Sequence, residues 1–238
     1  EIMRNINDIK LLTEPASSTK TKKSLDYKYA NYILYLLPSN QIIDNKKFNT
    51  CPWASEGCSK VCLNTSGRGR FDSVQNARYK KTLYFFKDKD NFINQLKIEI
   101  NKAIIKSEKK GLIPVFRLNG TSDLPFHKFN IFEEFPNIQF YDYTKDYKKV
   151  LNNNIPNYHL TFSLSESNEE KAIQVKENKH NVAIVFNTLP KYYKFGNKYY
   201  RVIDGDKHDL RFLDDKNIIV GLLAKGDGKK DNSGFVRN

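Results

Sequence analysis

The chain carries three cysteines, and all of them fall within twelve consecutive positions. They are Cys51, Cys58 and Cys62, in the spacing Cys-x6-Cys-x3-Cys. We interpret them as ligands of a metal centre, because a disulfide framework needs paired cysteines and an oxidising compartment. A structural zinc ion takes four protein ligands, and the histidine nearest in sequence is His127, whereas a [4Fe–4S] cluster can be held by three thiolates. The sequence favours the cluster; zinc and a metal-free set of buried thiols are the alternatives.

A short basic turn follows the cysteines. Its sequence is Gly67-Arg68-Gly69-Arg70, and it leads into a helix predicted from residue 73. Arginines and helix N-termini both attract anions, so Arg68 and Arg70 are candidate anion-binding residues. A solvated basic turn without a ligand is the alternative interpretation.

Polar side chains gather where the predicted strands end. In parallel α/β folds the ligand site lies beyond the carboxyl ends of the strands, so we expect a pocket for a charged small molecule there. The candidates for binding a cofactor or substrate are Arg117, Asn119, Ser122, Asp123, Lys145, Thr161, Ser163, Ser165 and Asn187. Arg117, Asp123, Lys145 and Asp209 are expected to converge with the cysteines over one mouth.

A second candidate site, catalytic or cation-binding, lies near the C-terminus. It comprises Asp204, Asp206, His208, Asp209, Arg211 and Lys225. Its aspartates could bind a divalent cation, and a tight acidic turn closed by Arg211 is the alternative.

The elements that must position these residues alternate along the chain. Strands are predicted by short apolar stretches at residues 32–37, 113–118, 138–143, 158–163, 181–186, 199–203 and 218–223. Helices are predicted at residues 73–110, divided near 87–90, and at 129–135, 146–151 and 168–177, the last capped by residues 165–167. Strands that alternate with helices indicate an α/β fold with a parallel sheet, rolled or open.

Composition is that of a globular protein with one domain. Hydrophobic residues make up 39% of the 238 residues, which is enough to bury a core. We expect residues 1–26, which include a Ser/Thr/Lys-rich stretch, to be an N-terminal arm or linker, and residues 27–238 to form the domain. No apolar run reaches the roughly 18–20 residues of a membrane span, and the start lacks a signal-peptide pattern, so a cytoplasmic location is expected.

The chain is strongly basic. Lysine and arginine total 40 against 27 acidic residues, which gives a formal net charge of +13. Such an excess favours polyanionic partners, either nucleic acid or phosphate-bearing small molecules. The alternative is compositional bias, since Lys, Asn and Ile are the residues that AT-rich coding tends to produce.

Four blocks of sequence resemble a phage- and plasmid-borne family described as gene product 88-like. They are Cys51-Pro52-x-Ala54-Ser55-x-Gly57-Cys58-x3-Cys62, Arg117-x-Asn119-Gly120-Thr121-Ser122-Asp123, residues 140–145 and residues 204–209. The resemblance extends from the first predicted strand to Val236. It indicates a family and does not imply an activity.

The order of elements is similar to that of radical S-adenosyl-L-methionine (SAM) enzymes. In that superfamily a three-cysteine loop follows the first strand, and the next strand ends in a glycine-containing polar turn, the place that residues 119–123 take here. The usual spacing there is Cys-x3-Cys-x2-Cys, from which this loop departs. The resemblance implies a partial TIM-like barrel of about six mainly parallel strands with helices outside. It also implies a [4Fe–4S] cluster on the cysteines, with SAM at its open iron.

The same resemblance implies roles for individual residues. Asn119, Ser122 and Asp123 would hold the amino acid part of SAM or of a substrate. Arg117 and Lys145 would bind its carboxylate or a phosphate. Cleavage of SAM would then yield a radical that abstracts hydrogen from an unidentified substrate, for which a phage setting suggests a nucleotide or a modified base.

Two other functions are compatible with the sequence. One is a nucleic-acid-binding protein in which a structural cluster or zinc staples the cysteine loop, and residues 20–23 and 68–70 contact phosphate. The other is a metal-free sugar or nucleotide binder on the same barrel.

Overall fold

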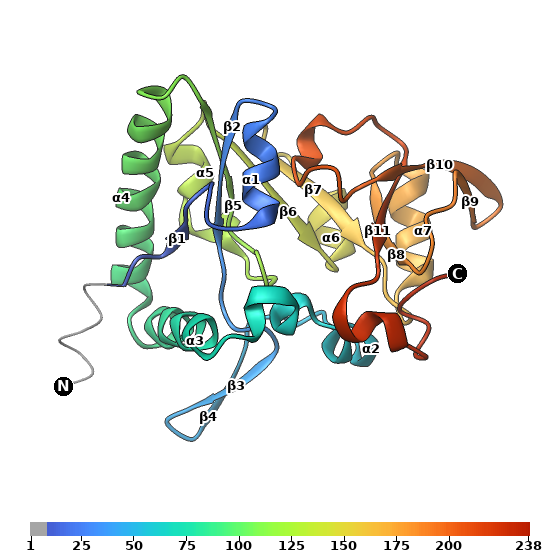
Figure 1. Cartoon of the computed structure of the whole chain (residues 1–238), viewed down its shortest axis with the longest axis horizontal. Coiled ribbons are helices and arrows are strands. Elements are labelled where there is room, and N and C mark those ends of the chain that lie inside the picture. The colour runs from blue at the N-terminus through green and yellow to red at the C-terminus, as the bar shows by residue number, and fades with distance from the viewer. Residues whose placement is uncertain (1–8) are drawn as a thin grey trace.

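Seven parallel strands form the centre of the structure. A computed structural model describes residues 9–238, and within them the apolar stretches pair into one nine-stranded sheet (Figure 1). In spatial order the strands are β1 (Leu12–Thr13), β2 (Tyr29–Leu34), β5 (Ile113–Arg117), β6 (Gln139–Thr144), β7 (Tyr158–Ser163), β8 (Val182–Phe186), β11 (Ile219–Leu223), β10 (Lys198–Asp204) and β9 (Tyr192–Phe195). The edge strands β1 and β9 are antiparallel to their neighbours, and the strands between them are parallel.

Helices cover one face of this sheet. They are α3 (Asp72–Lys87), α4 (Lys89–Glu108), α5 (Ile131–Glu134), α6 (Tyr147–Leu151) and α7 (Glu169–Glu177), with the 3-10 turn η4 (Phe126–Phe129) before α5. Alternate strand residues, among them Phe116, Phe140 and Phe162, point to this face and pack with apolar helix residues in one large core. Within residues 9–238, no helix is both long and apolar enough to cross a membrane.

The opposite face is covered by α1 (Thr19–Leu25) and by residues 205–218, which include the 3-10 turn η5 (Arg211–Leu213). Val115 and Tyr141 pack there against Leu210 and Phe212. The strands also present polar side chains on this face, and we call it the polar face. Because successive strand residues point to opposite sides, Arg117 lies on this face while its neighbour Phe116 lies in the helix-covered core.

The connections at the carboxyl end of β2 carry the cysteines. A hairpin of β3 (Asn40–Ile43) and β4 (Lys46–Asn49) comes first, followed by α2 (Glu56–Lys60) and the 3-10 turns η2 (Leu63–Thr65) and η3 (Gly67–Arg70). Figure 1 shows this hairpin, α2 and α3 gathered at one end of the sheet, beside the last part of the chain. The last part includes the turn η6 (Gly226–Lys230).

The predicted α/β class and the alternation of strands and helices are confirmed. The sheet remains open, because its order ends in β1 and β9 and these two strands do not pair with each other. The strand at 158–163 and the division of the long helix near 87–90 agree with the prediction. The strand predicted at 32–37 lies at Tyr29–Leu34, because its pairing with β5 begins with Tyr29 opposite Ile113. The helix predicted from residue 168 begins at Glu169, and Asn168 rather than residues 165–167 precedes it.

Residues 9–26 pack onto the sheet, where the sequence predicted an arm or linker. Leu11 and Leu12 are buried in the core, and β1 pairs with β2. The hydroxyl of Ser18 caps α1 by accepting a hydrogen bond from the Thr21 N–H at 3.2 Å. The remainder of the predicted arm, residues 1–8, lies outside the described residues.

Candidate functional site

A carboxylate anchors the cysteine loop (residues 51–62) to the sheet. Glu166, which follows β7, accepts hydrogen bonds from the Ser55 hydroxyl and the Gly57 N–H, both at 2.8 Å. Ser55 also accepts from the Cys58 N–H at 3.1 Å and thereby caps α2. A side chain at position 57 would displace the carboxylate of Glu166, since its Cβ would lie 2.7 Å from it. These contacts fix α2 over the carboxyl end of β7.

A second anchor holds the start of the loop against β5. The Asp123 N–H donates to the Thr50 carbonyl oxygen at 2.7 Å. The thiol of Cys51 then lies 3.6 Å from the Thr121 carbonyl oxygen. The loop therefore spans the carboxyl ends of β5 and β7, as expected for a site in a parallel α/β fold.

The three thiols lie in one neighbourhood. Burial raises the pKa of Cys62, and Cys58 raises it further, while the cations of Lys145 and Arg78 act in the opposite direction. Burial also raises the pKa of Cys51, with an additional contribution from Cys62. Among residues 9–238, no three His, Cys, Asp or Glu side chains come together closely enough to hold a single metal ion.

Lys145 joins the cysteine loop to the ends of β6 and β7. Its Nζ donates to the Ser163 hydroxyl at 3.1 Å and lies 5.6 Å from the centre of the Phe235 ring. Phe235 belongs to an apolar cluster that Cys58 contacts, so the C-terminal segment covers this side of the thiols. The carboxylate of Asp123 accepts from the Lys145 N–H at 3.0 Å. Three of the predicted binding residues therefore gather around the cysteines.

Asn119 and Ser122 form hydrogen bonds that shape the turn after β5, to each other and to Asp142 on β6. The backbone N–H and the side-chain amide of Asn119 donate to the two carboxylate oxygens of Asp142, at 2.8 and 3.2 Å. The side-chain oxygen Oδ1 of Asn119 accepts a hydrogen bond from the Ser122 hydroxyl at 2.8 Å. The turn also needs glycine at position 120, where a Cβ would lie 2.8 Å from the Leu34 carbonyl oxygen. Both polar residues therefore shape the turn that presents Asp123.

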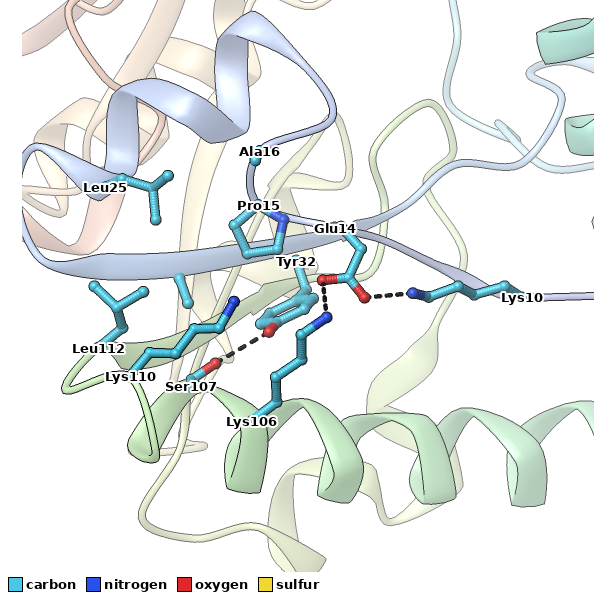
Figure 2. Close-up of a pocket in the computed structure, with 11 residues that line it drawn as sticks. Lys10, Glu14, Pro15, Ala16, Leu25, Tyr32, Lys106, Ser107, Lys110 and Leu112 are labelled. Atoms are coloured by element: carbon cyan, nitrogen blue, oxygen red, sulfur yellow. Dashed lines mark hydrogen bonds and ion pairs between the residues drawn. The ribbon is translucent and has the colours of Figure 1, made fainter.

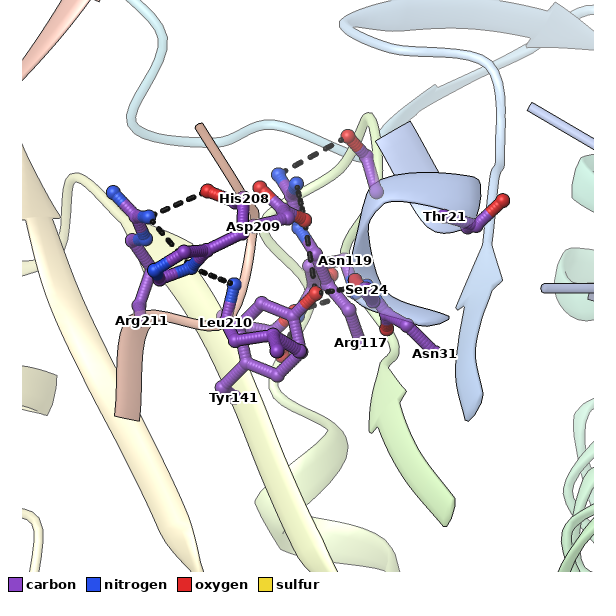
Figure 3. Close-up of polar contacts among 12 residues, drawn as sticks. Thr21, Ser24, Asn31, Arg117, Asn119, Tyr141, His208, Asp209, Leu210 and Arg211 are labelled. Atoms are coloured by element: carbon purple, nitrogen blue, oxygen red, sulfur yellow. Dashed lines mark hydrogen bonds and ion pairs between the residues drawn. The ribbon is translucent and has the colours of Figure 1, made fainter. Parts of the chain in front are cut away.

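Arg117 and Asp209 form a buried ion pair on the polar face. Arg117 Nη1 lies 2.9 Å from Asp209 Oδ2, which also accepts a hydrogen bond from the Tyr141 hydroxyl at 2.9 Å (Figure 3). Asn31 donates to the same hydroxyl at 2.7 Å, and the guanidinium lies 4.7 Å from the centre of the Tyr143 ring. Burial lowers the pKa of Arg117, but Asp209 and the neighbouring tyrosines Tyr141 and Tyr143 together outweigh it, so the pKa is raised. Arg117 is thus held as a cation.

The residues of the predicted second site do not share one partner. Asp209 turns inward to Arg117, whereas Asp206 forms an ion pair with the exposed Lys225. Arg211 is fully buried, lies 3.2 Å from Asp214 and donates a hydrogen bond to the His208 carbonyl oxygen.

The other predicted residues make separate contacts. The Thr161 hydroxyl lies 3.5 Å from His159 Nε2, and the Ser165 N–H donates to Asn168 at 2.7 Å. Asn187 donates to Asn238 at 2.7 Å, and the His208 ring nitrogen Nδ1 accepts from the Leu210 N–H at 3.2 Å. Arg70 lies 3.9 Å from Asp227, and Arg68 is exposed. None of these contacts involves a cysteine.

Two cavities adjoin the sheet. One, of about 460 Å³, lies near the start of β2, where Glu14 pairs with both Lys10 and Lys106, and Tyr32 bonds to Ser107 at 3.1 Å (Figure 2). The other, of about 440 Å³, adjoins the cysteine loop at Pro52 and Trp53 and is lined by residues of η4 and α6. Among the residues that line this second cavity, only Asp123 was predicted as a site residue.

Fold and site together define a mixed α/β protein with a three-thiol loop across the carboxyl edge of a mostly parallel sheet. The chain belongs to the Gene product 88 family, whose family model matches residues 10–238. Comparison with curated proteins and with solved structures gave no significant match.

Proposed function

We propose that Cys51, Cys58 and Cys62 bind a [4Fe–4S] cluster and that the protein is a radical-SAM-like enzyme with a nucleotide-related substrate. The observation that carries the proposal is the position of the three thiols at the carboxyl edge of parallel strands, in a loop that follows the first of them. That arrangement is shared with the partial TIM-like barrel of radical SAM enzymes, and the open sheet is compatible with it.

The surroundings of the thiols suit a cluster. Three thiolates bind three different irons of a [4Fe–4S] cluster, so they need not meet at one point as the ligands of a zinc ion must. Lys145 and Arg78 supply positive charge beside Cys62, which offsets the negative charge of the thiolates. The apolar C-terminal cluster around Phe235 restricts solvent access to Cys58.

A bound cluster would supply an open iron for SAM and the electron for its reductive cleavage. The chain would bind the amino acid part of SAM through Asp123 and Ser163, with Lys145 facing its carboxylate. Asn119 and Ser122 would act indirectly, since they hold the turn that carries Asp123. Glu166 would keep α2 and its cysteine in place.

Anaerobic purification, followed by an absorption spectrum and a count of iron, sulfide and zinc, tests the proposal. We expect a brown protein with about four irons and four sulfides per chain. Cys58→Ser should remove the chromophore and any cleavage of SAM, while Ser59→Ala, an exposed change in the same loop, should retain both. An unchanged spectrum in Cys58→Ser would refute the assignment.

Nucleic-acid binding is the second candidate, favoured by the exposure of Arg68 and Arg70 on η3, directly after the cysteine loop. A colourless protein with one zinc per chain and salt-sensitive binding to DNA or RNA would favour this function. In that case Arg68→Gln together with Arg70→Gln should reduce the salt dependence of binding.

A further inference from the structure

The cavity beside the cysteine loop has the dimensions of a small-molecule site. Its volume is about 440 Å³, within the range of about 300–1,000 Å³ typical of ligand pockets. Its walls come from the residues after Cys51, from the turn η4, from α6 and from the segment that leads into β7. Its lining residues include Trp53, His127, Lys128, Lys148 and Lys149.

The cavity has more positive than negative charge. Lys128, Lys148 and Lys149 face two carboxylates, those of Asp123 and Asp146. Asp146 accepts hydrogen bonds from the backbone N–H groups of Lys148 and Lys149, at 3.1 and 3.3 Å. Asp123 is likewise occupied by the Thr144 hydroxyl and the Lys145 N–H. The exposed ammonium groups of Lys128 and Lys148 therefore remain available for an anion.

Two buried nitrogen atoms at the cavity lack a hydrogen-bond partner among the described residues. Lys149 has a side chain that is 9% exposed, and its Nζ lies 3.6 Å from Asp123 and 5.6 Å from the centre of the Tyr158 ring. His127 Nδ1 is the other atom. Lys149 has the carboxylate of Asp123 as its ion partner. Buried polar atoms nearly always have a partner, so His127 Nδ1 points to a ligand with a hydrogen-bonding group. Burial lowers the pKa of His127, and Lys149 and Lys128 lower it further, so its ring is neutral at pH 7.

An aromatic side chain stands at the rim. Trp53 is the only tryptophan of the chain, and 48% of it is exposed. A large apolar ring that remains exposed beside a basic cavity offers a surface on which a nucleobase can stack. Asn152 and Asn154, which are also exposed, add amide groups that can bond to the edge of a base.

We propose that this cavity binds a mononucleotide, with its phosphate on Lys128 and Lys148 and its base against the indole of Trp53. An ammonium group is a strong donor to phosphate, and the cavity supplies two that are exposed. The proposal goes beyond the cluster and does not depend on it, because none of these residues is a cysteine.

Trp53 itself provides the assay. Its fluorescence is the only tryptophan signal of the protein, so a base that stacks on it should quench the emission in a saturable manner. AMP and GMP should both bind with a Kd below about 1 mM, and adenosine should bind roughly tenfold more weakly because it lacks the phosphate. Inorganic phosphate should compete with AMP without quenching Trp53. Calorimetry on the same protein gives each Kd independently of the optical signal.

Matched variants identify the site. Lys128→Gln together with Lys148→Gln removes two exposed cations at the cavity and should weaken AMP binding about tenfold or more. Lys191→Gln together with Lys198→Gln removes two exposed cations near β9 and should change the Kd less than about twofold. Trp53→Phe should keep part of the affinity, since phenylalanine can also stack.

Several outcomes would overturn the proposal. They are the absence of saturable binding by calorimetry, adenosine and AMP of equal affinity, and equal losses in the two lysine pairs, which would indicate general electrostatic attraction. Binding of a single-stranded oligonucleotide without any binding of AMP would also overturn it and would assign the cavity to a nucleic acid strand. Because metal content is measured separately, failure here leaves the cluster proposal untouched.

Discussion

The buried ion pair of Arg117 and Asp209 gives the sharpest test of how the polar face is held together. Asp209→Asn keeps the shape of the side chain and removes its charge. The guanidinium of Arg117, only 8% exposed in its side chain, would then lie in the protein interior without the carboxylate that lies 2.9 Å away in the native protein.

The expected loss in the free energy of unfolding can be estimated from the environment of the pair. Removing one partner of a buried pair costs about 3–5 kcal/mol, since the remaining charge stays buried. Asparagine can still accept hydrogen bonds from Arg117 and Tyr141, so we expect a loss at the lower end of this range, about 3 kcal/mol. That is a large part of the about 5–15 kcal/mol that stabilises a typical domain. Arg117→Met should cost a similar amount, and the double variant should lose at least about 1 kcal/mol less than the sum of the two.

Urea denaturation of the four proteins at pH 7 measures each free energy of unfolding and completes the cycle. Repeating it at 0.1 and 1 M salt should change the coupling little, because a buried pair is screened weakly. A loss under about 1 kcal/mol in Asp209→Asn, or single losses that simply add, would refute the account of a desolvated pair.

Two further predictions concern other parts of the structure. Glu166→Gln weakens both hydrogen bonds that anchor α2, so limited proteolysis should cut within residues 51–71 faster than in the native protein, while Glu170→Gln, an exposed change, should leave the rate unchanged. Burial lowers the pKa of His159 to about 4, against about 6.5 in an unfolded chain. The unfolded state therefore takes up this proton first, so stability is complete above pH 6.5 and falls toward pH 4, by about 3 kcal/mol at most. His159→Gln should flatten that part of the curve of unfolding free energy against pH, and an unchanged slope would contradict the assignment.

Hydrophobic pattern predicted the central strands because each lies buried between two layers. The strand at 158–163 begins after a proline and alternates between the core and the polar face, so its limits are visible in the sequence. The start of β2 is not visible, since residues 32–37 are the more continuous apolar run and pairing with β5 decides which residues are extended. Short elements that depend on partners far along the chain, namely β1, α1 and β9, were not predicted. The β3–β4 hairpin was also missed, although residues 44 and 45, both with positive φ, form a turn that Asp-Asn favours.

The predicted site shows the same limit for side chains. The rule that polar residues at strand ends share one edge correctly brought Asp123, Lys145 and Ser163 together. It could not show that the hydrogen-bond donors of Asn119 would be engaged by Asp142, because a buried carboxylate 23 positions away has no signature in the local sequence. Nor could it show that Arg117 would form an ion pair with Asp209, which lies far along the chain.

Asp123 belongs to both the thiol neighbourhood and the cavity. Its N–H holds the chain at Thr50, one residue before Cys51, and its carboxylate lies 3.6 Å from Lys149 inside the cavity. The same carboxylate contributes to the raised pKa of Cys51, after burial and the other neighbours of that thiol. Parallel strands bring the ends of β5 and β6 to one edge, so a single residue after β5 can reach the loop on one side and α6 on the other. The two proposed sites are therefore adjacent because of the topology of the sheet, and each can be tested through residues that they do not share, the cysteines for one and Lys128 and Lys148 for the other.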